Sequence, residues 1–140
     1  MPDAVAPAPA APEGEGDSPY YAARDGLRFA GTHLLLDLWG ARNLTDVETV
    51  EAILREAVDA AGATLLRIHL HRFDGSGGVT GVAILAESHM SIHTWPETGY
   101  VAIDLFVCGS CDAHRAIPVL KRGFEPTRLQ VSEHRRGLAP

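Results

Sequence analysis

Residues 86–97 hold side chains that could let the chain cut its own backbone. Ser88 follows Glu87 and precedes His89, and a second histidine, His93, lies five positions after the serine. A serine hydroxyl that attacks the preceding peptide carbonyl converts the amide into an ester, and a base can then remove the serine α proton and expel the ester. Dehydroalanine results, and its hydrolysis leaves a pyruvoyl group. This chemistry needs a strained turn, a hydroxyl and a base.

Each of these residues also has an ordinary structural interpretation. A serine that follows a strand usually belongs to a turn, and a strand histidine such as His93 usually belongs to the core or the surface. For the chemistry, we expect the chain to bend just after Ser88 and to bring the His93 imidazole back beside it as the base. Cys108 in isolation is a small buried hydrophobe. A thiol can also return a proton to a carbanion, because its pKa can be tuned toward neutrality.

The chain has eleven arginines but a single lysine, Lys121. Enzymes that use pyridoxal phosphate as an electron sink need a lysine for the Schiff base. Lys121 falls in a stretch that is expected to form the exposed surface of a helix. We therefore expect no pyridoxal phosphate.

Residues 1–18 differ in composition from the rest of the chain. They consist mainly of Ala, Pro, Gly and acids, and they include no Lys or Arg. Such a segment buries too little apolar surface to offset its ordering entropy, so we predict a disordered tail and then a single domain over residues 19–140. The tail lacks the basic start of a signal peptide, and prolines interrupt its alanines, so the protein is expected in the cytoplasm.

Charge and hydropathy argue against two classes of partner. The formal net charge is −6, the arginines are scattered, and no basic stripe or RNA-binding aromatic motif occurs, so nucleic acid is not expected. No apolar run approaches the roughly 20 residues of a membrane helix. A small-molecule ligand is the favoured partner.

Hydrophobic periodicity predicts the elements that must position these side chains. A mostly buried strand is expected over residues 31–39, and a helix over residues 45–61. Thr45 and Glu48 have the spacing of a capping box, and Gly62 suits a left-handed stop at the carboxyl end.

Four more strands are predicted in the middle of the chain, over residues 63–73, 79–86, 90–95 and 100–108. In the first of these, Leu66, Ile68 and Leu70 are expected to share the buried face. In the last, the residues expected to face the core are Val101, Ile103, Leu105 and Val107.

A second helix is predicted to begin after Asp112, to bend at Pro118 and to end near Gly123, before a last strand over residues 127–132. Two helices are too few for parallel crossovers between so many strands. The predicted fold class is therefore α+β: a two-layer α/β sandwich in which two helices cover one face of an antiparallel sheet.

Spaced motifs agree in order across almost all of the chain outside the tail. They are GTH at 31–33, GVTGV at 78–82, ESH at 87–89, IHTWPE at 92–97, Tyr100, IDLFVCG at 103–109 and SEHRRG at 132–137. Together they resemble prokaryotic S-adenosylmethionine decarboxylase proenzymes, most closely from His71 to Cys108. So many motifs in one order argue against chance.

The resemblance implies that the backbone breaks between Glu87 and Ser88. The products would be a beta chain of residues 1–87 and an alpha chain of residues 88–140. Ser88 would become the pyruvoyl group, which forms the Schiff base with substrate. No pyridoxal phosphate and no metal would be needed.

The resemblance also implies roles for residues around the cut. His93 would be the processing base, and Cys108 would return a proton to the substrate after carbon dioxide leaves. Phe73 would stack on adenine, and Glu97 would hold the ribose hydroxyls. Thr80 stands where many relatives have serine, and its hydroxyl is expected to assist processing.

As a whole, the resemblance implies an enzyme that converts S-adenosylmethionine to its decarboxylated form and carbon dioxide for spermidine biosynthesis. Relatives pair their sheets into homodimers of processed subunits, with active sites near the interface, so a homodimer is expected. Thr32, where many relatives have arginine, leaves the contacts of the first strand open.

Some members of the wider family resemble this fold and processing site yet decarboxylate L-ornithine or L-arginine. Those substrates need an acid to meet a cationic side chain. Asp74, beside Phe73, could supply it, although it also suits the start of a Gly-rich turn.

Two other classes of protein remain as distant alternatives. Cys108 and Cys111 form a Cys-x-x-Cys pair, but a thioredoxin-like module would place a strand, helix and strand around it, and no disulfide is expected in the cytoplasm. A metal-binding module would use the histidines, but no spacing matches a recognised zinc pattern. These histidines are His69, His71, His89 and His93.

Overall fold

The structure is a computed structural model that describes residues 22–24 and 26–139. The acidic tail predicted over residues 1–18 lies outside the described residues. A short hairpin of β1 (Ala22–Arg24) and β2 (Leu27–Phe29) opens the described chain, and the sequence periodicity does not predict it.

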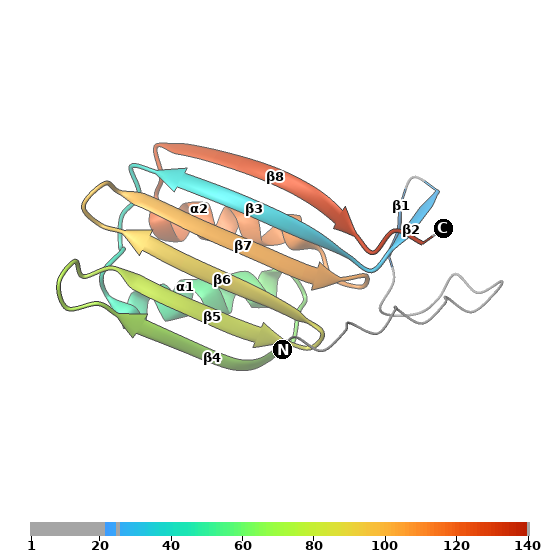
Figure 1. Cartoon of the computed structure of the whole chain (residues 1–140), viewed down its shortest axis with the longest axis horizontal. Helices are drawn as coiled ribbons and strands as arrows, with labels where there is room; N and C mark the ends of the chain where they lie inside the picture. The colour runs from blue at the N-terminus through green and yellow to red at the C-terminus, as the bar shows by residue number, and fades with distance from the viewer. Residues whose placement is uncertain (1–21, 25, 140) are drawn as a thin grey trace, which may run out of the picture.

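Six strands form one antiparallel sheet (Figure 1). Their order across the sheet is β4-β5-β6-β7-β3-β8, so the first of the six in sequence lies between two strands from the carboxyl half of the chain. Hairpins join β4 through β7, each of which pairs with the next. The six strands are β3 (Gly31–Trp39), β4 (Leu65–Arg72), β5 (Val79–Leu85), β6 (Ser88–Trp95), β7 (Tyr100–Cys108) and β8 (Arg128–Arg136).

Both helices lie against one face of the sheet, behind it in Figure 1. They are α1 (Val47–Ala60) and α2 (Ala116–Phe124), and a 3-10 turn, η1 (Ala113–Arg115), precedes the second. The predicted two-layer α+β fold is confirmed. Within the described part of the chain, neither helix has the length and apolar content needed to span a membrane.

The core fills the layer between the sheet and the helices. The alternation predicted for residues 100–108 is confirmed, because all four expected core residues of β7 are buried. In the described chain no helix covers the other side of the sheet, which we call the open face. By strand alternation its residues on the four middle strands are His33, Leu35, Asp37, Trp39, Thr80, Val82, Ile84, His89, Ser91, His93, Trp95, Tyr100, Ala102, Asp104, Phe106 and Cys108.

The start of α1 differs from the predicted capping box. Asp46 is the N-cap, and its carboxylate accepts hydrogen bonds from the Glu48 backbone N–H at 3.2 Å and the Thr49 hydroxyl at 2.8 Å. The capping box at Thr45 is therefore wrong by one residue, because the acid that follows it makes the bond. Gly62 has a φ of 77°, as a left-handed stop requires.

The face assigned to Leu66 is also wrong. A β-bulge between Leu65 and Arg67 shifts the pairing of β4 with β5. As a result Leu65 packs against the core and Leu66 is 64% exposed. Simple alternation cannot reveal one inserted residue. Ile68 and Leu70 pack against the core as expected.

The second helix departs from the prediction at three points. Asp112 caps η1, accepting a backbone N–H at 3.1 Å, and the break in the helix comes where η1 changes to α2. Pro118 lies in the first turn of α2, where its missing N–H costs little. Gly123 is inside the helix, which ends with Glu125 in the left-handed conformation. Gly123 instead permits close packing, because a Cβ there would lie 2.7 Å from Ile53 of α1.

Two strand ends also differ. β6 begins at Ser88, before the predicted strand over residues 90–95, and β8 continues to Arg136, beyond the predicted residues 127–132. The bend expected just after Ser88 comes instead before it, at Glu87, whose φ is 57°.

Candidate active site

The peptide bond between Glu87 and Ser88 lies in the tight turn that joins β5 to β6. Leu85 pairs with Ser88, so only two residues make the turn. A left-handed φ at a residue with a Cβ costs roughly 1–2 kcal/mol, and here it falls at Glu87. The half-buried Ser88 hydroxyl donates to the Ala86 carbonyl at 3.0 Å, so it points back over the turn. The site therefore combines backbone strain at Glu87 with a serine hydroxyl held by the turn itself.

His93 does not lie beside Ser88 within one chain. β6 is a continuous strand over both residues, and five residues of extended chain span about 16 Å. The expectation that the chain folds back is wrong, because the bend precedes the serine. His93 instead pairs with Thr80 of β5, its Nδ1 lying 3.2 Å from the threonine hydroxyl.

Cys108 ends β7 at the same end of the sheet as Ser88. The antiparallel register pairs His89 with Phe106, which brings the start of β6 beside the end of β7. The Cys108 thiol is free and half-buried. Cys111 follows across a turn in which its N–H donates to the Cys108 carbonyl at 3.1 Å. Burial and the neighbouring Cys108 raise the pKa of the Cys111 thiol.

The residues proposed to bind substrate lie at the other end of the sheet. Phe73 and Asp74 are exposed in the loop from β4 to β5, and Glu97 is exposed in the turn from β6 to β7. Figure 1 shows both loops at the end opposite the β5–β6 turn. The edge of the Phe73 ring contacts His71, with a centroid distance of 4.7 Å. One chain thus holds two separate groups of candidate residues.

Comparison with known proteins identifies the family. A model of the family described as S-adenosylmethionine decarboxylase matches residues 32–137. The chain belongs to this family. Membership in the S-adenosylmethionine decarboxylase family favours a decarboxylase over the thiol-redox and metal-binding alternatives.

Individual relatives agree with the family match. Proteins named S-adenosylmethionine decarboxylase proenzyme include one from Thermomicrobium roseum, 43% identical over 113 residues, which span 80% of this chain and 97% of the relative. Another, from Methanococcus maripaludis, is 47% identical over 115 residues, spanning 80% of this chain and 93% of the relative. A crystal structure of the adenosylmethionine decarboxylase from Aquifex aeolicus matches with a TM-score of 0.70 and 38% identity, over 76% of this chain and 90% of that one.

In this member of the S-adenosylmethionine decarboxylase family, the open face also carries a network centred on Asp104. The His33 and His89 Nε2 atoms lie 2.7 Å and 2.8 Å from one carboxylate oxygen, and the Ser91 hydroxyl donates to the other. Burial alone would raise the pKa of Asp104, but the hydrogen bonds from Ser91, His89 and His33 outweigh it and hold the pKa below its ordinary value. Sequence reasoning missed this network, although one acid in the middle of an apolar strand was a usable signal.

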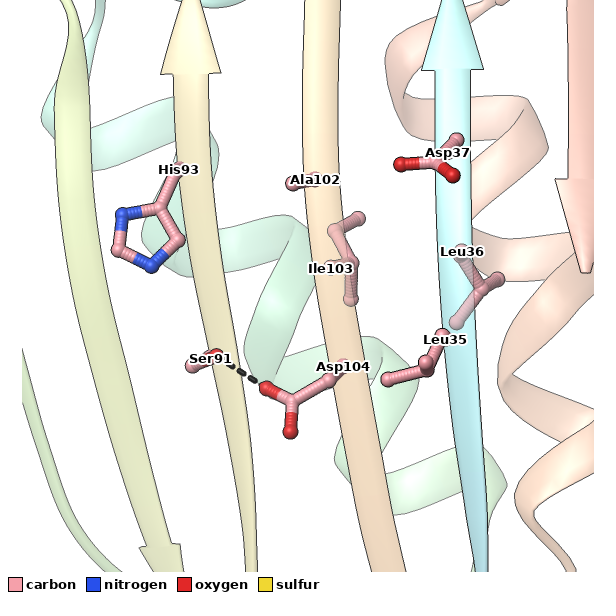
Figure 2. A pocket seen from close by; sticks show the side chains of 8 residues that line it. All are labelled: Leu35, Leu36, Asp37, Ser91, His93, Ala102, Ile103 and Asp104. Atoms are coloured by element: carbon pink, nitrogen blue, oxygen red, sulfur yellow. Dashed lines mark hydrogen bonds between the residues drawn. The ribbon is translucent and has the colours of Figure 1, made fainter. Parts of the chain in front are cut away.

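A cavity of about 330 Å³ opens beside this network, on the open face over β6, β7 and β3 (Figure 2). Asp104 and Asp37 are its two acids, and the His93 imidazole lines it from β6. Asp37 accepts a hydrogen bond from the Tyr100 hydroxyl. That bond, burial and the nearby negative charge raise the pKa of Tyr100 to about 12. The residues lining the cavity are Leu35, Leu36, Asp37, Ser91, His93, Ala102, Ile103 and Asp104.

We expect Asp104→Asn to change the pH dependence of stability. The folded pKa of Asp104 lies below its ordinary value of 3.8, so the carboxylate contributes stability that is fully present above pH 3.8 and is lost as the pH falls from there through the lower folded pKa. Urea unfolding should be measured from neutral to acid pH for the chain with Asp104 and for the Asp104→Asn variant. Both should also carry Ser88→Ala, which prevents cutting of the backbone. The variant should be less stable near neutral pH, and the difference should shrink below about pH 4. A constant difference would contradict the assignment.

Proposed function

We propose that this chain is a self-processing, pyruvoyl-dependent decarboxylase that converts S-adenosylmethionine to decarboxylated S-adenosylmethionine and carbon dioxide, for spermidine biosynthesis. The observation that carries most weight is the position of the Glu87–Ser88 peptide bond in a strained turn. Cys108 at the same end of the sheet, and the family of the chain, support the same conclusion.

Processing would begin at the Ser88 hydroxyl. Its oxygen bonds to the Glu87 carbonyl carbon while the C–N bond breaks, which gives an ester and a free amine. A base then takes the α proton of residue 88 and the C–O bond breaks, so Glu87 leaves as a carboxylate and dehydroalanine remains. The imine tautomer adds water and loses ammonia, which leaves a pyruvoyl group at the start of the alpha chain.

The chemistry of the residues here suits such a group. Ser88 has the required hydroxyl, and the half-buried Cys108 supplies a proton donor on the neighbouring strand. Once formed, the group supplies a ketone for the substrate amine and a conjugated carbonyl that accepts the electrons of decarboxylation. Cys108 would return a proton to the substrate α carbon, Phe73 would stack on adenine, and Glu97 would accept hydrogen bonds from the ribose.

We infer that the working unit is a homodimer. His93 and its partner Thr80 stand about 16 Å along the strand from Ser88, too far to act on it within one chain. The open face also exposes large apolar side chains, which commonly mark an interface. They are Leu35, Val82, Ile84 and Trp95. A second copy packed face to face would cover them and bring its His93 to the first copy's Ser88.

Self-processing should be visible by denaturing mass spectrometry of the purified protein. We expect two fragments that meet between Glu87 and Ser88, the second lighter by one ammonia than a fragment made by hydrolysis. Ser88→Ala should remain a single chain. An intact wild-type chain would exclude the pyruvoyl mechanism.

The dimer can be tested by mixing two inactive chains. Ser88→Ala and His93→Ala should each remain uncut when made alone. Produced together, they form some mixed dimers in which the intact Ser88 of one chain meets the intact His93 of the other. We expect part of the His93→Ala chain to be cut in the mixture, as measured by mass spectrometry. Absence of that cut would argue that each site is built within one chain.

Substrate choice is tested by carbon dioxide release from S-adenosylmethionine, L-ornithine and L-arginine in parallel. We expect release from S-adenosylmethionine alone. Release from either amino acid would support the alternative in which the exposed Asp74 meets a cationic side chain.

The role of Cys108 is tested by comparing two thiol variants. Cys108→Ala should be cut, but its rate of decarboxylation should fall by about 100-fold or more, whereas Cys111→Ala serves as the matched thiol control. Equal rates for the two thiol variants would remove Cys108 from the proposed chemistry.

A further inference from the structure

Asp104 joins three neighbouring strands of the sheet through its side chain. It lies on β7 and accepts hydrogen bonds from His33 of β3 and from His89 and Ser91 of β6. Figure 2 shows the bond from Ser91. Both carboxylate oxygens are thus occupied, which fixes the orientation of the group. His89 is the residue next to Ser88.

The direction of these bonds follows from the charges. An ionised carboxylate only accepts hydrogen bonds, so both imidazoles donate from Nε2. The other ring nitrogen of His33 lies 3.5 Å from the Arg136 guanidinium, which can only donate. His33 thus contacts Arg136 through one ring nitrogen and holds the carboxylate with the other, while His89 holds the same carboxylate oxygen from β6. The rings of His33 and His89 meet edge to face, with centroids 5.7 Å apart.

Scission between Glu87 and Ser88 would remove the hydrogen bond that the Ser88 side chain makes within the turn. The Ser88 hydroxyl bonds to the Ala86 carbonyl, which would belong to the beta chain after the cut. The hydroxyl oxygen itself would leave with Glu87. Beyond the strand pairing of β6, the nearest described side-chain contact that holds residue 88 in place is then the one from His89 to Asp104.

We propose that His89 and Asp104 form a clamp that positions residue 88 after the cut. This inference rests on the proposed function. Asp104 and Cys108 share β7, four residues apart, so the clamp ties the new chain start to the strand that carries the proton donor. His89 and Asp104 are positioning residues in this role. The clamp should matter less before the cut, when residue 88 is held by a covalent bond on each side.

Replacement of His89 should therefore separate processing from turnover. We expect His89→Ala to be cut to completion but to show a kcat about 10- to 100-fold lower, with a KM within about twofold of wild type, because the substrate-binding residues are elsewhere. His89→Gln, whose amide can donate from nearly the same place, should recover most of the loss. His114→Ala, which removes an exposed histidine of η1 away from the open face, is the matched control and should behave as wild type.

Several outcomes would overturn the clamp. They are an unchanged kcat in His89→Ala, a His89→Gln no better than alanine, or a KM that rises while kcat holds. If His89→Ala fails to fold, Asp104→Asn keeps nearly the same shape and should give the same result, complete cutting with a lowered kcat.

The possible metal-ligand atoms of His33, His89 and Asp104 lie within 4.8 Å of one another. Stoichiometric zinc in the purified protein, together with loss of kcat in EDTA, would therefore indicate a metal site in place of the clamp. An uncut wild-type chain would refute the proposed function itself and is distinguishable from all of these.

Discussion

A sheet with apolar side chains on both faces needs cover on both, and the described chain has helices for only one. This constraint organises the rest of the molecule. The helix side is a conventional core. The open side carries Asp37, Asp104, several histidines and the exposed apolar residues, and it is the face on which the proposed second copy packs. The extended geometry of β6 is consistent with the proposed dimer, because a straight strand cannot bring its two ends together.

Carboxylates on such a face must accept hydrogen bonds before water is excluded, since a buried ion without partners is costly. Asp104 and Asp37 both meet this condition within one chain, the first through two histidines and a serine, the second through Tyr100. Among the described residues, no buried side-chain nitrogen or oxygen lacks a hydrogen-bond partner. The open face can therefore be covered while Asp104 and Asp37 keep their hydrogen-bond donors.

The sequence was most informative where one physical signal dominated. β3 and β7 have the predicted bounds because apolar periodicity and flanking turns agree there. It failed where two residues could do the same work, as with Thr45 and Asp46 at the start of α1, or where one residue interrupts a pattern, as in the bulge at Leu66. The length of β8 was missed because its last residues are polar.

The candidate site followed the same rule. The turn at Ser88 could be placed from sequence, but the bend was assigned to the wrong side of the serine, and with it the place of His93. The individual roles of the site residues were predicted from resemblance to a family. The geometry of a single chain does not by itself assign those roles. The Asp104 network depends on three strands meeting in register, which no local pattern specifies.

The strand order has a consequence for what a cut at Ser88 would produce. β4, β5 and β3 would belong to the beta chain, and β6, β7 and β8 to the alpha chain, yet β3 is inserted between β7 and β8. The two fragments would be interleaved in one sheet, and neither could leave without breaking strand pairing on both sides of β3. Their separation would amount to unfolding, and recovery from it would require two molecules to meet. The mature protein would refold at a rate that depends on concentration, whereas its uncut precursor would fold alone.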